Sequence, residues 1–177
     1  MFRIPIAIGI AAVSLYTARK SYIAITNLRR YEERSERAAR HSETAAQELH
    51  KTRTTQASSA GAIALSLLSS VALVLSTVLG SSDLTAWEHV LPPVNLLATG
   101  AGFVHNQNFW KAKAKVPFVG GFNEGIEKSK EIRQLLFGLG IAWWALEASL
   151  RRDEDVRKDM VFKYRKVPGI DAVLHEY

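Results

Sequence analysis

The chain has 177 residues, no cysteine and a formal net charge of +6. Apolar residues make up 47% of it, which excludes disorder throughout, and the lack of cysteine excludes a disulfide framework or a cysteine-ligated metal site. Charges and long apolar runs occupy different stretches. The sequence therefore favours an all-α fold, an integral membrane helical bundle with three or four hydrophobic helices in a single domain, 1–177.

The first apolar segment covers residues 4–18. Arg3 precedes it, Arg19 and Lys20 follow it, and no small-x-small cleavage site stands just before Arg19. We therefore expect an uncleaved anchor helix and not a signal peptide that is removed. All charged side chains before Glu32 are basic, a bias that also fits mitochondrial targeting.

A polar, basic stretch follows over residues 20–55. Its central part, 32–51, contains no glycine or proline and is rich in alanine, glutamate and arginine, which are good helix formers. The pattern predicts a polar helix over 20–55 and a basic helical arm over 20–56. Two interpretations stay open: a solvated helix with surface pairs such as Glu36–Arg40, or an arm that docks on a partner or on anionic lipid headgroups.

The second apolar segment, 58–79, contains no charged residue. A helix of this length reaches about 33 Å, enough to cross a hydrocarbon core of about 30 Å. Small residues recur along one face of this segment and of the first one, and this spacing lets helices approach closely in lipid. We expect these residues to form packing faces, within the chain or against another subunit: Ala7, Ala11, Ser14, Ala18, Ser58, Ala62, Ser66 and Ser70.

The third apolar segment is expected over 88–106, with Pro92 and Pro93 in or near its first turn. Trp87 and Trp110 flank it about 34 Å apart on a helix, so they are predicted to mark the two faces of one bilayer. The alternating lysines that follow are predicted to contact anionic lipid headgroups, and nucleic acid is not expected between membrane segments: Lys111, Lys113 and Lys115.

The fourth apolar segment, 134–150, is short, and both a thin span and an interfacial helix remain open. Glu147 is the one acid inside an apolar run. It either pairs with Arg151 at i+4 or is a buried functional carboxylate. A charged C-terminal tail is expected over 151–177. The connections around 19–56 and 105–134 carry a basic excess, which predicts that they share the cytosolic or matrix side.

Polar residues recur on one face of the third segment, from Asn95 through Thr99 and Gly102 to His105 and Asn106. They indicate interhelical hydrogen bonds or, alternatively, a polar pocket. Histidine has an unperturbed pKa suited to acid–base chemistry, so the pocket's catalytic candidates are the following three: Asn95, His105 and Glu147.

The sequence contains no His-x-x-x-His, Glu-x-x-His, Gly-x-Ser-x-Gly, Gly-x-Gly-x-x-Gly or Walker pattern, so no metal or cofactor is expected. The size, the four-segment layout and the stretch 133–140 before the last helix resemble the small cofactor-independent anthrone oxygenases of polyketide pathways. That resemblance implies a cofactor-free membrane enzyme, and it transfers no site residue.

Two functions remain. The first is a non-enzymatic accessory subunit, assembly factor or membrane organiser that acts through helix packing with other membrane protein subunits. The second is a small membrane enzyme or carrier with the polar pocket. The expected location is a membrane, with the mitochondrial membrane ahead of the endoplasmic reticulum.

Overall fold

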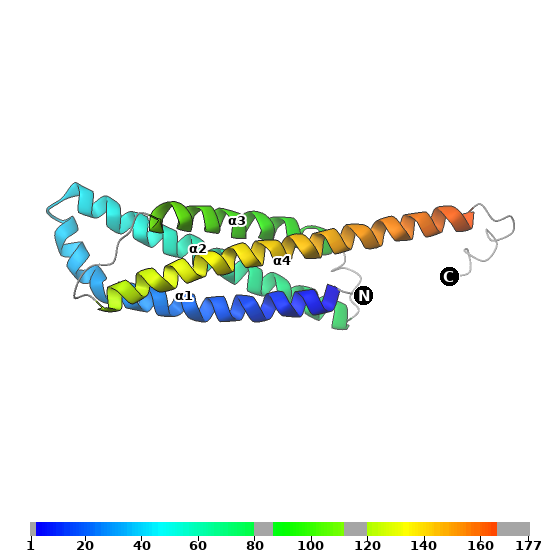
Figure 1. Cartoon of the computed structure of the whole chain (residues 1–177), viewed down its shortest axis with the longest axis horizontal. Helices are drawn as coiled ribbons and strands as arrows, with labels where there is room; N and C mark the ends of the chain where they lie inside the picture. Colours follow the sequence, from blue (N-terminus) through cyan, green and yellow to red (C-terminus); the bar gives the residue numbers. More distant parts are fainter. Residues whose placement is uncertain (1–2, 80–86, 112–119, 166–177) are drawn as a thin grey trace.

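The computed structural model of the chain describes residues 3–79, 87–111 and 120–165, and these form four α-helices without any strand (Figure 1). The helices are α1 (Arg3–Ala39), α2 (Glu43–Leu79), α3 (Leu91–Trp110) and α4 (Gly120–Arg165). The prediction of an all-α helical bundle is confirmed.

Consecutive helices run antiparallel, and α4 closes the bundle by packing on both α3 and α1 (Figure 1). At one end, which we call the hairpin end, α1 turns into α2, α3 finishes and α4 begins. At the other, the extension end, α1 and α3 begin and α4 continues past the other helices. Arg3 ties this second end together, with its guanidinium 2.9 Å from Glu88 Oε2 and 3.1 Å from Asp153 Oδ2.

The prediction of one polar helix over 20–55 is wrong, because the chain turns at residues 40–42. The polar stretch instead forms the ends of two long helices. Ser42 stands directly before α2, and serine is a preferred residue at a helix N-cap. The turn lets the apolar halves of α1 and α2 pack against each other, and Glu36 pairs across it with Arg53.

Two other boundaries differ from expectation. α3 begins at Leu91 and continues to Trp110, with both prolines in its first turn as predicted. The fourth apolar segment and the first part of the expected tail form one helix, since α4 runs unbroken to Arg165. Residues 166–177 lie outside the described part of the chain.

The core follows a heptad-like spacing on α4, where five side chains are each no more than 2% exposed: Leu136, Leu139, Trp143, Leu146 and Leu150. Toward the extension end the last four of these pack with Ala7, Ile10 and Leu73, and at the hairpin end Leu28, Trp110 and Ile126 form a separate cluster. Between these two clusters lies a third, formed by Ala24, Ala62, Ile63, Ile132 and Leu136, so apolar layers follow one another along the bundle and the polar contacts lie among them.

Within the described residues, one stretch is long and apolar enough, by length and composition, to cross a membrane. It is Ala46–Leu79 of α2. This is the stretch that contains the second apolar segment.

Candidate functional site

A buried hydrogen-bonded cluster joins three helices in the middle of the bundle. Ser66 Oγ of α2 lies 2.9 Å from Ser14 Oγ of α1 and accepts a 2.9 Å hydrogen bond from Trp143 Nε1 of α4. All three side chains are fully buried. Because a buried indole N–H without an acceptor is costly, the Ser66 hydroxyl allows tryptophan to sit in the core.

The small residues predicted to form packing faces mostly point inward. Ala7, Ala62 and Ser70 are buried with Ser14 and Ser66, whereas Ala11, Ala18 and Ser58 are partly exposed. A Cβ added at Gly102 of α3 would lie only 3.3 Å from Ala62 Cβ, so α2 and α3 approach closely there. The buried small residues therefore pack against other helices of the same chain.

Between residues 94 and 104, the inner face of α3 carries the polar side chains and its outer face the large apolar ones. Asn95, Thr99 and Asn106 are buried, and their side chains donate respectively to Leu91 O at 2.8 Å, Asn95 O at 2.7 Å and Ser59 Oγ at 3.2 Å. The exposed side chains of this helix include three large apolar ones: Val94, Leu97 and Val104. The predicted polar stripe therefore faces the bundle interior, apart from His105, which is exposed.

The three catalytic candidates do not meet. A Cβ at Gly140 would lie 3.4 Å from Thr99 Oγ1, which sets the antiparallel register of α3 and α4. From that level His105 lies toward the hairpin end and Glu147 toward the extension end, which separates them by about 20 Å along the bundle. A pocket that combines an imidazole with this carboxylate is therefore not assembled.

Glu147 has a local partner. Its Oε1 accepts a 2.8 Å hydrogen bond from Arg151 Nε, one turn later on α4. The i+4 pair predicted from the sequence is therefore present.

The proposed membrane-interface residues separate into three groups. Trp87 is 52% exposed, whereas Trp110 is 1% exposed and packs against Leu28 and Ile126 in the core. Trp110 therefore faces the bundle interior, and the expectation that it marks the level of a bilayer surface stays a prediction. Lys111 is exposed just after α3. Lys113 and Lys115 lie outside the described residues.

An ion-pair cluster that was not predicted joins α1 to α4. Lys20 Nζ and Lys128 Nζ each lie 2.9 Å from a carboxylate oxygen of Glu131, and Lys20 also lies 5.3 Å from the centre of the Tyr16 ring. The bond to Glu131 is the main cause that raises the pKa of Lys20. The same bond, followed by that from Lys128, lowers the pKa of Glu131.

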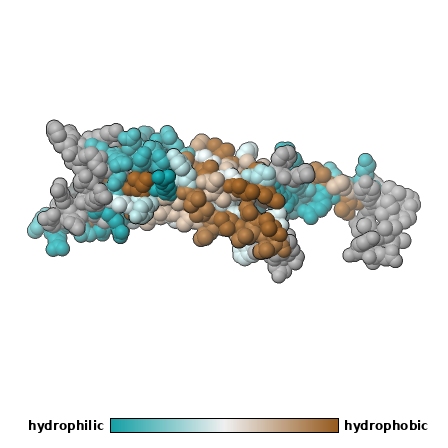
Figure 2. Space-filling model, turned by 90° about the horizontal axis from the view of Figure 1, so that it is seen from below, coloured by the Kyte–Doolittle hydropathy of each residue, from teal (hydrophilic) through white to brown (hydrophobic). Residues whose placement is uncertain are grey.

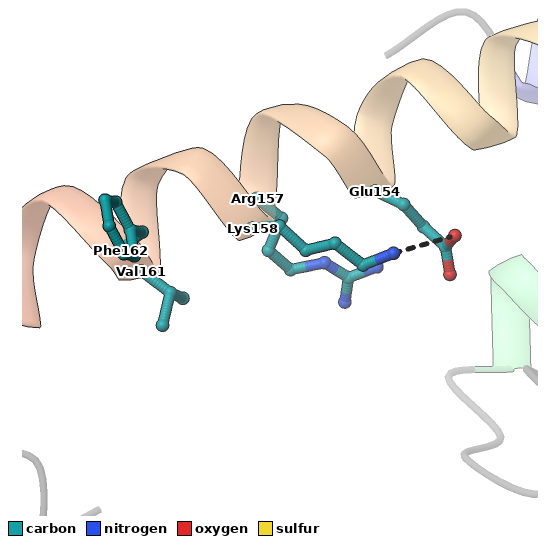
Figure 3. Close-up of a pocket in the computed structure, with 5 residues that line it drawn as sticks. All are labelled: Glu154, Arg157, Lys158, Val161 and Phe162. Carbon is teal, nitrogen blue, oxygen red and sulfur yellow. Dashed lines mark ion pairs between the residues drawn. The ribbon is translucent and has the colours of Figure 1, made fainter.

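The described residues line two large hollows that are open to the surroundings. One, of about 440 Å³, lies between α3 and α4 and is lined by apolar side chains such as Phe103, Phe137 and Trp144. The other, of about 540 Å³, lies beside the end of α4, and the residues that Figure 3 shows around it all come from that helix: Glu154, Arg157, Lys158, Val161 and Phe162. Neither gathers acid–base groups around an enclosed space.

No protein-family model, curated protein or solved structure matches this chain. The described residues also contain no cluster of three or more acidic or histidine side chains that could hold a metal ion.

Sequence reasoning missed the role of Trp143 and the Lys20–Glu131 pair. A signal for Trp143 was available, because it stands at the centre of the 3–4 spacing of buried leucines on α4. No comparable signal marks Lys20 and Glu131, which are far apart in the sequence and meet only because α4 packs on α1.

Proposed function

We propose that the chain is an integral membrane protein whose four helices cross the bilayer as a bundle. In this proposal it acts as an accessory subunit or assembly factor, and the parts outside the bilayer dock on partner proteins. The observation that carries the membrane assignment is the reversed polarity of α3.

A helix on the surface of a water-soluble bundle buries its apolar face and exposes its polar face. α3 does the opposite, because it buries Asn95, Thr99 and Asn106 and exposes Val94 and Leu97, the latter 73% exposed. Polar side chains inside a membrane usually turn toward the bundle, where they find partners. The mean hydropathy of α3 includes both faces, so the buried polar residues lower it although the outward side chains named here are apolar.

The other helices extend this apolar surface into a belt. Exposed apolar side chains come from every helix, for example Ile8 of α1, Leu68 of α2, Leu97 of α3 and Phe137 of α4. No aspartate, glutamate, lysine or arginine occurs within 4–18, 58–79, 91–110 or 134–146. On the face that Figure 2 shows, apolar surface gathers along the middle of the molecule with hydrophilic surface toward both ends, as a bilayer would require.

Two helical parts would stand outside the bilayer. One is the α1–α2 turn at the hairpin end. The other is residues 151–165 of α4, which we call the extension. The extension leaves three large apolar side chains more than half exposed among charges: Val156, Met160 and Val161. Apolar side chains exposed together on one helix are typical of a surface that packs on a partner.

The charges support one orientation. The basic excess around the hairpin end favours the cytosolic or matrix side, which places the extension on the opposite side. The six lysines and arginines of the extension count against this orientation, because acidic residues offset the bias little, but the connections 19–56 and 105–134 together carry fifteen. The basic start of the chain keeps the mitochondrial membrane ahead of the endoplasmic reticulum in this proposal.

Native electrophoresis tests the docking role. A tagged chain extracted in mild detergent should migrate in a defined complex whose members mass spectrometry identifies. The double variant Met160→Ser, Val161→Ser should dissociate from that complex yet remain in the membrane, because it changes only the extension. Val104→Ser, on the apolar belt, is the matched control and should stay in the complex. Migration of the wild-type chain alone, or unchanged assembly of the double variant, would contradict the proposal.

A further inference from the structure

A small polar cavity lies inside the bundle toward the hairpin end, and all four helices line it. The space open to a water-sized sphere is about 10 Å³. Trp110 and Asn106, on its wall, are 1% and 2% exposed. None of the described residues that line it has a charged side chain, and its polar members are Ser21, Gln56, Ser59, Asn106, Trp110 and Ser129.

Three polar atoms on this wall are buried and have no hydrogen-bond partner among the described residues. They are Gln56 Nε2, Asn106 Oδ1 and Trp110 Nε1. The neighbouring groups are satisfied, since Asn106 Nδ2 donates to Ser59 Oγ and Ser129 Oγ donates to Gly125 O. The wall thus presents two free donors and one free acceptor, an arrangement that is costly unless a ligand meets it.

We propose that this cavity binds one water molecule, which accepts hydrogen bonds from Trp110 Nε1 and Gln56 Nε2 and donates one to Asn106 Oδ1. Its second proton can be donated to the Ser21 hydroxyl, which lines the same cavity. A water has two acceptor and two donor positions, so it matches this wall. The space suits one water and excludes a larger solute.

The choice of ligand follows from the lining. An anion or cation has no charged side chain here to balance it, and an apolar molecule would leave all three polar atoms unsatisfied. The water links Gln56 of α2 to Asn106 and Trp110 of α3. It is therefore a tertiary contact that sets the register of these two helices.

Nuclear magnetic resonance of the ¹⁵N-labelled full-length protein in detergent micelles tests the site, with the Trp110 indole proton as the probe. We expect a cross peak between this proton and water. The matched control is the Trp143 indole, which is equally buried but bonds the Ser66 hydroxyl, so it also reports any signal relayed through a serine hydroxyl. Absence of the Trp110 cross peak, or equal cross peaks at both indoles, would overturn the proposal.

A substitution at Gln56 gives a second, independent readout. Gln56→Met removes one donor to the water, so it should lower the melting temperature and abolish the Trp110 cross peak. If instead the amide has no partner, its removal relieves a buried unsatisfied group and the melting temperature rises, which would refute the water site. Gln47→Met, exposed on the same helix, controls for the change of side chain. Should Gln56→Met fail to fold, the wild-type cross peak decides alone.

Discussion

At the residue scale, the Ser66 hydroxyl links α2 to both α1 and α4 within hydrogen-bonding distance. A serine is small enough to let the helices approach and polar enough to accept from Trp143. An alanine or glycine at this position would supply only the first property.

Ser66→Ala should therefore destabilise the bundle by about 1–3 kcal/mol, because it leaves the buried Trp143 indole without its acceptor. The measurement is reversible unfolding of the purified protein in detergent. Ser70→Ala is the control, since Ser70 is equally buried but bonds only Leu67 O of its own helix. We expect its effect to stay within about 0.5 kcal/mol. An equal loss of unfolding free energy in the two variants would show that the hydrogen bonds of Ser66 do not stabilise the fold.

At the element scale, α1 and α4 are far apart in the chain and are joined by the Lys20–Glu131 pair. The hydrogen bond lowers the pKa of Glu131, so the pair stabilises the fold above the ordinary carboxyl value of 4.5, and this contribution is lost as pH falls through the lowered pKa. The pKa of Lys20 is raised, so its contribution to stability is present below pH 10.5. This contribution is lost only as the pH rises through the raised pKa.

Glu131→Gln should consequently lower the melting temperature at pH 7, and the gap to the wild-type protein should close as the pH falls well below 4.5. Thermal unfolding in detergent across this pH range measures the gap. Glu48→Gln is the control, because Glu48 pairs with Lys51 at an exposed site within one helix. A gap that stays constant with pH would mean that the lost interaction is not ionic.

At the scale of the whole molecule, the antiparallel order places the hairpin and the extension at opposite ends of the apolar belt (Figure 1). If the belt spans a bilayer, these two parts lie on opposite sides of it. The chain contains no cysteine, so single cysteines can report accessibility without background.

We expect Gln47→Cys and Lys158→Cys to react with a membrane-impermeant maleimide from opposite sides of sealed membranes. Leu68→Cys, although 69% exposed on the bundle, should stay unlabelled even after the membrane is opened, because lipid covers it. Labelling of Gln47→Cys and Lys158→Cys from the same side of the membrane would refute the four-span topology. Labelling of Leu68→Cys as fast as Gln47→Cys would refute the membrane belt itself.

The sequence by itself determined the features that depend on neighbouring residues. The helical content follows from composition and spacing, the placement of Pro92 and Pro93 follows from their missing N–H groups, and the Glu147–Arg151 pair follows from the helical repeat. The third segment's polar stripe was also visible, because its period is that of a helix face.

Only the tertiary structure decided which side chains of different helices contact one another. The break at 40–42 depends on the packing that it permits between α1 and α2, and the inward turn of Trp110 depends on which face of α3 its neighbours cover. The register of α3 on α4 separates His105 from Glu147, and α4 brings Trp143 to Ser66. These contacts join residues distant in sequence, and no local spacing encodes the register in which two helices pack.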